Sequence, residues 1–595
     1  MKGGCRERRI QFSFCRQRLR GGYDSATIAS VVNAGPNLGA VNRSADRHVA
    51  AIGVDFGTLS ARAVVVDLAD GAVLGSAMSD YRNGVVDEFL PTSRQRLPPD
   101  WALQVPSDYV EAMVSAVRAA MVDGDIDPGS IVGIGTDFTA CTVLPTLADG
   151  TPLCEIDEFV DRPHAYVKLW KHHAAQAQAD RLNKLAHDRD EPWIRRYGGK
   201  LSSEWEFAKA LQVLEEDRDL YLAMQRWVEA GDWIVWQLCG VYLRSACTTG
   251  YKAARQDGRY PPPDYFAALN PEFERFIQDK VDQPIGMLGE RAGGLTAAMA
   301  ARLGLREGIA VCVGNVDAHV TAPAGGAVHV GQMVAIMGTS TCHVVNGADL
   351  RDVEGMCGVV DGGIVPGLWG YEAGQSGVGD IFGWFVANGV PPTLHEAAAA
   401  AGRSVHEQLT ELALGQPVGA HGLVALDWHS GNRSVLVDHA LSGVIIGQTL
   451  ATRPEDIYRA LVEATAFGTR VIVEQLEAAG VPVVDFIVAG GLLKNPLVMQ
   501  VYADVLRRPI HVIESEQAPA IGSAMHAAVA AGRFPDIVAA AKAMAHLRRD
   551  AWVPDLSRSD VYDRLFAMYR SLHEHFSTHR ELMHELRSIR REALS

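Results

Sequence analysis

The sequence predicts an α/β protein built from two similar domains. Segments with strand patterns and segments with helical periodicity alternate along the chain, which is typical of this class. The 595 residues are 48% hydrophobic, so the chain can bury at least two cores of ordinary domain size. Two apolar segments also lead into similar glycine–threonine turns, GVDFGTLSAR from Gly53 and MGTSTCH from Met337. These turns suggest an internal duplication, although two short hairpins can also resemble each other by chance.

The chain begins with a segment unlike the rest. Its opening stretch, MKGGCRERRIQFSFCRQRLR, contains seven Lys or Arg and one Glu, and a Gly-, Asn- and Ser-rich stretch follows. We expect residues 1–48 to form a disordered basic extension. A transit segment is the alternative, because the stretch is Arg-rich and acid-poor, but it lacks the long apolar core of a secretory signal.

The first predicted folded region starts at Val49. AIGVDFG and ARAVVVDLADGAVLG have the pattern of apolar strands, with a Gly/Thr/Ser turn after the first and a hairpin turn at Asp70 and Gly71. Helical periodicity follows at residues 109–122. The strand and turn IVGIGTDFTACTVLP come next, and long amphipathic helices are predicted between residues 165 and 240.

A second region repeats this opening at residues 330–350, with an apolar strand, a Gly-Thr turn and another apolar strand. IYRALVEATAFGTRVIVEQLEAAGV has apolar residues at helical spacing, and Gly480 suits a left-handed helix end. DFIVAGGLLKNPLVMQVYADVL then predicts a buried strand, a glycine pair and a helix. The chain closes on an amphipathic helix that starts near Ser559.

Charge and composition argue against several kinds of partner. A net charge of -16 and a pI of about 5.7 provide no basic field that would attract nucleic acid or an anionic membrane. The sequence has no uninterrupted apolar run of about 18 residues, the length of a membrane span. Its nine cysteines include no CxxC pair and no histidine at metal-ligand spacing, as expected in a reducing cytosol. We therefore expect a cytoplasmic protein with no nucleic-acid or membrane partner.

The two Gly-Thr turns have the composition of phosphate-binding loops. Glycine allows a phosphate to approach backbone N–H groups, and Thr and Ser add hydroxyl donors. Asp55 precedes the first turn and could hold Mg²⁺, or could only cap the turn. The phosphate loop GxxxxGK[ST] is absent, because Leu follows Gly199 and Lys200. A nucleotide held between the two turns is the remaining interpretation. Gly490 and Gly491 would then be a third contact; a plain strand-to-helix turn is their alternative role.

Phosphoryl transfer to an alcohol also needs a carboxylate near the attacking hydroxyl. Asp317 in VCVGNVDAHV is the candidate, because an apolar strand delivers Gly314, Asn315 and then this acid. His319 could be the base instead, or could be a structural histidine.

Several motifs occur in an order that resembles a known enzyme family: GVDFGTLSAR, GTDFTAC, GYKA, GNVDAH, MGTSTCH, GLWGYEAGQSGVGD, LDWHSGNRS and AGGLLKNPLVMQVYADVL. From about Val49 to the C-terminal helix, the chain is similar to the FGGY carbohydrate kinases, and LDWHSGNRS and GYEAGQS are most similar to the ribulokinases among them. The resemblance implies two actin-like (RNase H-like) ATPase domains, residues 49–306 and 307–595, that flank a nucleotide and sugar cleft.

The resemblance also implies an activity. This is the phosphorylation of L-ribulose by ATP at its 5-hydroxyl, which gives L-ribulose 5-phosphate in L-arabinose catabolism. Asp317 would take the hydroxyl proton, Asp55 would lie near Mg²⁺, and a homodimer would be ordinary. The residues implied for the sugar are Ala140, Lys252, Asp317 and Glu372, and those implied for ATP are Gly57, Thr58, Ser60, Arg62, Gly338, Thr339, Ser340, Gly490, Gly491 and Asn495.

Two alternatives stay open. Residues outside these motifs decide stereochemistry, so the acceptor could be another pentulose or a pentitol, such as D-ribulose, L-xylulose or ribitol. An actin-like ATPase without sugar transfer is the second alternative, but it gives no reason for Lys252 and Glu372. Two features depart from the family pattern: the N-terminal extension, and Arg507, where the small residue of a tighter turn is expected.

Overall fold

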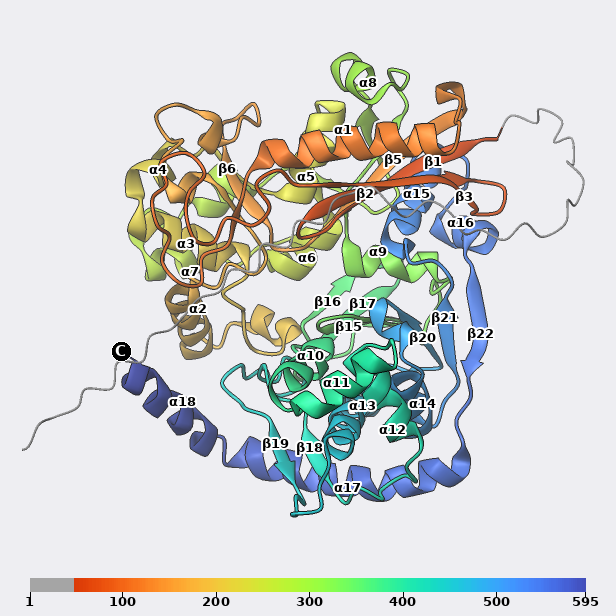
Figure 1. The fold of residues 1–595 in the computed structure, drawn as a ribbon. Coiled ribbons are helices and arrows are strands. Elements are labelled where there is room, and N and C mark those ends of the chain that lie inside the picture. Colours follow the sequence, from red (N-terminus) through yellow and green to blue (C-terminus); the bar gives the residue numbers. More distant parts are fainter. Residues whose placement is uncertain (1–47, 595) are drawn as a thin grey trace, which may run out of the picture. The chain divides into compact units, whose positions relative to one another are not determined.

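The computed structural model describes residues 48–594 of the chain, and the predicted basic extension at residues 1–48 lies outside them except for its last residue. Strands and helices alternate along the described residues, and most strands join one of two large sheets (Figure 1). This arrangement confirms the predicted α/β class. In the described part of the chain, no helix has both the length and the apolar character that a membrane crossing requires.

The first sheet surrounds the first glycine–threonine turn. β1 (Ala50–Phe56) runs antiparallel to β2 (Ser60–Asp67) and parallel to β5 (Ile131–Phe138), so the predicted hairpin is confirmed. α1 (Pro106–Asp123) packs on β2 and begins at a proline, which suits the first position of a helix (Figure 1). The strand order is β11-β12-β5-β1-β2-β3, and β13 also pairs with β5; the other bounds are β3 Val73–Asp80, β11 Arg291–Gly294, β12 Ala310–Cys312 and β13 Asn315–Val316.

The second sheet repeats this arrangement around the second turn. β14 (Gln332–Met337) is antiparallel to β15 (Thr341–Gly347) and parallel to β20 (Asp485–Ala489), as β1 is to β2 and β5. The shared topology supports the predicted duplication. The strand order is β16-β17-β15-β14-β20-β21-β22, with β16 Gly358–Asp361, β17 Trp369–Gln375, β21 Ile510–Ile513 and β22 Leu547–Trp552.

Small residues allow a helix to pack closely on the first sheet. α15 (Ala518–Ala530) lies against β1, β5 and α9 (Asp317–Ala324). A Cβ atom at Gly53 would overlap the carbonyl oxygen of Ala520, so the glycine in the first strand permits this close approach. The apolar core around α15 combines side chains from both sheets, among them Val64, Ala524 and Val334.

Two helices of the second half end at left-handed residues, as predicted for Gly480. α13 (Pro454–Ala478) ends just before that glycine, whose φ is +87°. α14 (Pro496–Leu506) follows the predicted glycine pair and ends at Arg507, whose φ is +54°. Arg507 Nη1 lies 3.0 Å from Oδ1 of Asp560 and 2.8 Å from Oδ2 of Asp563. Arg507 therefore keeps the tight turn expected of a small residue and adds ion pairs to the closing helix.

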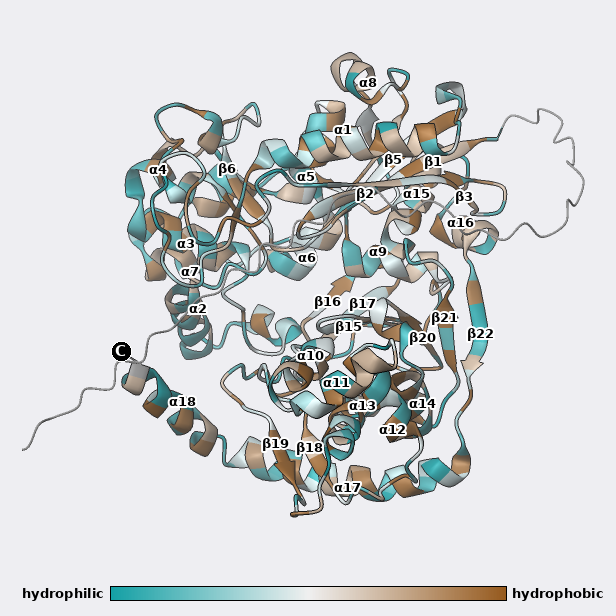
Figure 2. Cartoon of the chain, in the orientation of Figure 1, coloured by the Kyte–Doolittle hydropathy of each residue, from teal (hydrophilic) through white to brown (hydrophobic). Residues whose placement is uncertain are grey.

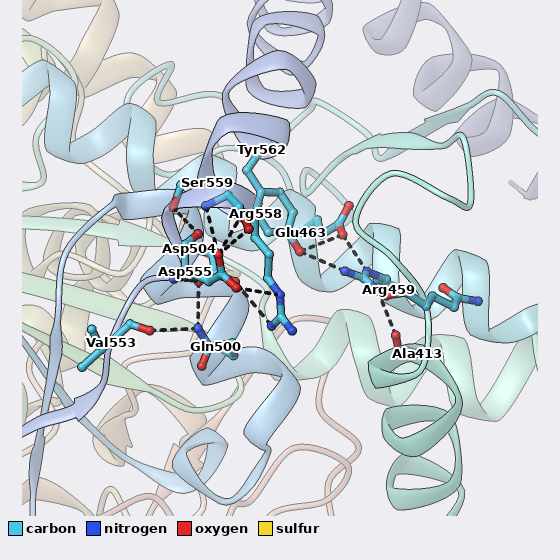
Figure 3. Close-up of polar contacts among 12 residues, drawn as sticks. Ala413, Arg459, Glu463, Gln500, Asp504, Val553, Asp555, Arg558, Ser559 and Tyr562 are labelled. Carbon is cyan, nitrogen blue, oxygen red and sulfur yellow. Dashed lines mark hydrogen bonds and ion pairs between the residues drawn. The ribbon is translucent and has the colours of Figure 1, made fainter.

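This closing helix, α17 (Leu556–Thr578), is fastened to α13 and α14 by polar contacts (Figure 3). The Tyr562 hydroxyl donates to Oε1 of Glu463 at 3.1 Å, and Arg459 Nε donates to the same oxygen at 2.9 Å. At the start of α17, Asp555 N donates to Oδ1 of Asp504 at 2.8 Å. These contacts hold α17 against α13 and α14.

The stretch between residues 165 and 240 differs from the prediction of long helices. Short strands interrupt it and pair with neighbours into a small sheet in the order β4-β7-β6-β8, a tertiary pairing that local periodicity does not reveal. The strands are β4 Leu103–Gln104, β6 Val143–Thr146, β7 Val167–Lys168 and β8 Arg226–Glu229. The helices of the region are α2 Gln176–Asp188, α3 Glu206–Glu216, α4 Arg218–Ala223 and α5 Ala230–Cys239, and α6 Ala246–Lys252, α7 Pro263–Leu269 and α8 Ala297–Leu303 follow it.

Two short strands of the first half, β9 Arg244–Ser245 and β10 Ile285–Gly286, pair with each other. In the second half, α16 Ile537–Met544 packs on α9 and α15. The other elements there are β18 Val424–Leu426, β19 Val444–Ile446, α10 Gly379–Asn388, α11 Pro392–Ala400, α12 Val405–Leu414 and α18 Glu581–Leu594. The predicted domain boundary between residues 306 and 307 falls just before β12, which still belongs to the first sheet. The division into domains stays a prediction.

Candidate active site

Each glycine–threonine turn is closed by a backbone hydrogen bond from its glycine, to the third residue on in the first turn and to the second residue on in the second turn. Gly57 N donates to the Ser60 carbonyl at 3.0 Å, and Gly338 N donates to the Ser340 carbonyl at 2.9 Å. In the first turn, Trp170 Nε1 also donates to the Thr58 hydroxyl oxygen at 3.1 Å. Because an indole N–H can only donate, the Thr58 hydroxyl keeps its own proton for another acceptor, such as a phosphate oxygen.

Asp55, Asp137 and Asn315 form a row of polar side chains at the ends of neighbouring strands. The strand register places Asp55 beside Asp137, and Asp137 beside Asn315. The Ser523 hydroxyl donates to Oδ2 of Asp137 at 2.6 Å. Oδ1 of Asp137 and Nδ2 of Asn315 are buried and have no hydrogen-bond partner among the described residues. Buried polar atoms of this kind normally bind something, so the row is suited to an additional polar group.

The two carboxyl groups of the row have raised proton affinity. Burial raises the pKa of Asp55, although Arg62, whose Nη1 lies 3.6 Å from Oδ2, acts to lower it. Burial and then the charge of Asp55 raise the pKa of Asp137. A bound cation would reverse this effect, because it offsets both negative charges.

The row of Asp55, Asp137 and Asn315 is better suited to Mg²⁺ than to a metal ion whose ligands all come from the protein. Across residues 48–594, no group of three or more His, Cys, Asp or Glu side chains could hold a metal ion. Mg²⁺ usually binds through one or two carboxylates and completes its shell with water and phosphate oxygens. Asp55 and Asp137 offer that number of carboxylates.

Asp317 begins α9, one residue beyond β13. Its Oδ1 accepts a hydrogen bond from Ala318 N at 2.7 Å, and the residue is partly exposed. Burial, followed by the charges of Asp55 and Glu372, raises the pKa of Asp317 to about 7, while Lys252 acts to lower it. A carboxyl group that titrates near neutral pH can accept a proton in the manner of a general base.

Glu372 on β17 is contacted by two cationic side chains and one histidine from other elements. Lys252 Nζ lies 2.9 Å from its Oε2, Arg433 Nη2 lies 2.7 Å from its Oε1, and His319 Nε2 lies 3.3 Å from its Oε2. Burial acts to raise the pKa of Glu372, but Lys252, His319 and Arg433 outweigh it and hold this pKa well below the usual range. Glu372 is therefore a fixed negative charge, and the Lys252 ammonium beside it keeps its proton.

The contacts of His319 favour its structural interpretation. The imidazole is buried and stacks on Tyr251, with ring centroids 4.2 Å apart. Its Nδ1 lies 3.5 Å from the Cys247 sulfur, and burial lowers its pKa. A neutral ring enclosed in this way is better placed to orient Glu372 than to take a proton from a substrate.

Ala140 lies in the turn after β5, and its side chain packs against the buried cluster that contains Cys247 and Tyr251. The next residue, Cys141, has a φ of +62°, and Lys209 Nζ donates to its carbonyl at 2.6 Å. The buried ammonium group of Lys209 thus stabilises the turn that carries Ala140.

The third predicted nucleotide contact combines one crowded glycine and one open glycine. Gly490 has a φ of +101°, and a Cβ atom there would overlap the carbonyl oxygen of Met337. At Gly491, by contrast, a Cβ atom would meet nothing within 4 Å. Asn495 caps α14 by accepting from Leu497 N at 3.0 Å, so its side chain already has a local role. The roles of these residues in binding stay predictions.

Sequence reasoning missed two residues of this site, Asp137 and Arg433. Both stand in quoted motifs, GTDFTAC and LDWHSGNRS, but nothing in either motif places the side chain next to Asp55 or Glu372. For Asp137 a usable signal exists, since an acid ends an apolar strand as Asp55 does. Arg433 comes from an irregular loop, and its partner could not be found without the tertiary structure.

Comparisons with known proteins agree on the kind of protein. Residues 333–531 match the model of the FGGY family of carbohydrate kinases, C-terminal domain. A ribulokinase of Mycolicibacterium smegmatis is 60% identical over 543 residues, which cover 91% of this chain and 96% of that protein. A ribulokinase of Bacillus licheniformis is 48% identical over 538 residues, which cover 89% of this chain and 98% of that protein.

Solved structures share the fold at low sequence identity. A xylulose kinase from Rhodospirillum rubrum has a TM-score of 0.73 at 22% identity and covers 90% of this chain and 99% of its own. A Plasmodium falciparum glycerol kinase with ADP has a TM-score of 0.68 at 13% identity, with 88% and 98% covered. These neighbours confirm the predicted two-domain, actin-like architecture.

Proposed function

Because this chain belongs to the ribulokinases, a group of the FGGY carbohydrate kinases, we propose that it transfers the terminal phosphoryl group of ATP to the 5-hydroxyl of L-ribulose. The product is L-ribulose 5-phosphate, and the reaction serves L-arabinose catabolism. The observation that carries the proposal is the place of Asp317, an acid whose pKa is raised by burial and then by the charges of Asp55 and Glu372, and is lowered in part by Lys252.

The ATP phosphates fit the two glycine–threonine turns. Backbone N–H groups and hydroxyls of such turns bind anionic oxygens, and Arg62 adds a positive charge beside the first turn. The open space at Gly491 suits the adenosine. The proposed ATP residues are Gly57, Thr58, Ser60, Arg62, Gly338, Thr339, Ser340, Gly490, Gly491 and Asn495.

Mg²⁺ would be held by Asp55 and Asp137, with Asn315 next in the row. When bound, the ion neutralises charge on the phosphate oxygens. The unpaired Oδ1 of Asp137 supports this role, because a buried carboxylate oxygen without a donor is costly unless a cation or water meets it.

In the proposed step, the 5-hydroxyl oxygen of the sugar attacks the terminal phosphorus as its proton passes to the Asp317 carboxylate. The new oxygen–phosphorus bond replaces the bond to ADP. Lys252 and Glu372 bind other sugar hydroxyls, with Ala140 shaping the pocket. Polar groups placed to meet a hydroxyl discriminate strongly against an analogue that lacks it.

The proposed cleft lies between two domains, residues 49–306 and 307–595, whose closure brings ATP and sugar together and excludes water. The protein would work in the cytoplasm, where ATP is available. The cysteines of the described residues are free thiols, which suits a reducing compartment. A homodimer is proposed from the family alone.

The experiment measures ADP release by the purified protein with Mg²⁺-ATP and a panel of acceptors: L-ribulose, D-ribulose, L- and D-xylulose, ribitol, L-arabinitol and no sugar. We expect the highest kcat/KM for L-ribulose and negligible release without sugar. A higher value for another acceptor would change the substrate and keep the kinase. Sugar-independent release would instead favour an ATPase.

A further inference from the structure

Arg433 reaches Glu372 from a loop that belongs to neither large sheet. Its Nη2 lies 2.7 Å from Oε1, and the side chain as a whole is 31% exposed. A Cβ atom at Gly374 would lie 3.0 Å from Cδ of Arg433. The glycine therefore leaves room for the arginine to lie along β17.

Glu372 is paired with two cationic side chains, so one can stay paired with it when the other moves. Lys252 and Arg433 both bond Oε1, at 3.1 and 2.7 Å. If Lys252 moves to meet a sugar hydroxyl, Arg433 keeps the buried carboxylate paired. Without Arg433, the same movement would leave a buried charge unpaired, which costs much more than the intact pair contributes.

The loop that carries Arg433 is closed on itself and fixed to β17. Asn432 N donates to the Asp438 carbonyl at 2.9 Å, and Asp438 N donates to the Asn432 carbonyl at 2.8 Å. Gly374 N donates to the Ser434 hydroxyl oxygen at 3.1 Å. The position of Arg433 therefore depends on Asp438, at the base of the loop.

The C-terminal helix α18 holds this base. His584 Nε2 lies 2.9 Å from Oδ2 of Asp438, and Arg587 Nη2 donates to the Leu441 carbonyl at 2.9 Å. Met583 is buried on the same side of the helix, whereas Glu585 is exposed. Figure 2 shows hydrophobic and hydrophilic residues mixed along α18; Leu582, Leu586 and Ile589 are exposed, so the polar contacts of His584 and Arg587 and the buried Met583 define the docked face.

We propose that α18 is a positioning element for the sugar site: by fixing the loop Asn432–Ser442 it holds Arg433 on Glu372, and so sets the affinity for the sugar. Arg433 acts through Glu372 and Lys252 and is a positioning residue. The inference rests on the proposed function, because it takes the Lys252–Glu372 pair to bind the acceptor.

The test compares the dissociation constant and KM for L-ribulose in full-length variants. Arg433→Met is expected to weaken sugar binding about ten- to a hundredfold, the usual effect of a lost charged hydrogen bond, with KM for ATP within about twofold. Arg433→Lys should recover part of the loss, because it restores charge without the planar fork. The pair His584→Ala and Arg587→Ala should weaken sugar binding by about three- to tenfold, typical of indirect coupling. Glu585→Ala on the exposed face is the matched control and should change nothing.

The decisive result is non-additivity. In an Arg433→Met background, the α18 substitutions should weaken sugar binding no further, because they act through Arg433. Additive losses, or an α18 effect on kcat and both KM values alike, would overturn the proposal. Thermal unfolding of each variant shows whether a loss of sugar binding comes from misfolding. If Arg433→Met misfolds, Arg433→Lys replaces it as the variant that is combined with the α18 substitutions. A wild-type protein that binds L-ribulose without phosphorylating it would refute the proposed function alone, and one that binds no sugar would refute both.

Discussion

Lys252 and Glu372 meet in a buried ion pair, with the ammonium nitrogen 2.9 Å from Oε2, although 120 residues separate them in the sequence. The lysine ends α6, and the glutamate lies in β17 of the second sheet. The pair therefore joins the two halves of the chain at the proposed sugar site. Removal of either partner would destabilise the fold, because the other charge would stay buried, away from water and unpaired.

Glu372→Gln should weaken both folding and sugar binding. The substitution leaves Lys252 and Arg433 without their carboxylate, and breaking a buried pair typically lowers the free energy of unfolding by about 3–5 kcal/mol. Urea denaturation measures the first effect, and titration with L-ribulose measures the second. Glu516→Gln is the control, since its ion pair with Lys494 is exposed on both sides and should contribute nothing measurable. Equal stability of the two variants would contradict the account.

Asp317→Asn should retain ATP binding and lose transfer. The amide cannot accept the hydroxyl proton, and loss of a general base typically costs about 10² to 10⁴ in rate. The measurements are kcat with L-ribulose and the dissociation constant for Mg²⁺-ATP. Near-normal turnover would remove Asp317 from the mechanism, and His319 would then be the next base to test.

The pH profile of kcat/KM should have an acidic limb set by Asp317. The carboxylate is the active form, and the pKa of Asp317 is raised to about 7, so activity should fall about tenfold per pH unit below that value. Above pH 8 this group should no longer limit the rate. Rates with L-ribulose between pH 5 and pH 9 measure the limb. A profile flat down to pH 5 would contradict this assignment.

Gly490→Ala should lower the stability of the protein, whereas Gly491→Ala should weaken the binding of ATP. At Gly490 a methyl group would overlap the Met337 carbonyl and strain a φ of +101°, so the free energy of unfolding should fall by at least about 1 kcal/mol. At Gly491 the methyl has open space, so stability should hold while KM for ATP rises and KM for sugar does not. An unchanged KM for ATP in Gly491→Ala would mean that the adenosine binds elsewhere.

The fold was more predictable than the site because its signals are local. Apolar strands flanking Gly-Thr turns predicted both hairpins, and helical spacing predicted α1 and α13. The small sheet that contains β7 and β8 was missed, because two-residue and four-residue strands depend on tertiary pairing and leave no periodic pattern.

The site depended on contacts that distant segments make. Asp317 was found from its place after an apolar strand. Asp137 was missed because its neighbour Asp55 lies on a strand paired with it only in the folded chain. Arg433 was missed because an irregular loop carries it to Glu372. Family resemblance supplied Lys252 and Glu372 as separate residues, and the structure adds that they pair.

The central claim is phosphoryl transfer to a specific hydroxyl of the sugar, and the most direct measurement is the identity of the product. Protein, Mg²⁺-ATP and L-ribulose are incubated, and the phosphorus NMR spectrum and the amount of ADP are recorded. The account predicts one sugar phosphate, esterified at the 5-hydroxyl, formed in equal amount to ADP. ADP accompanied by inorganic phosphate, with the sugar unchanged, would contradict it.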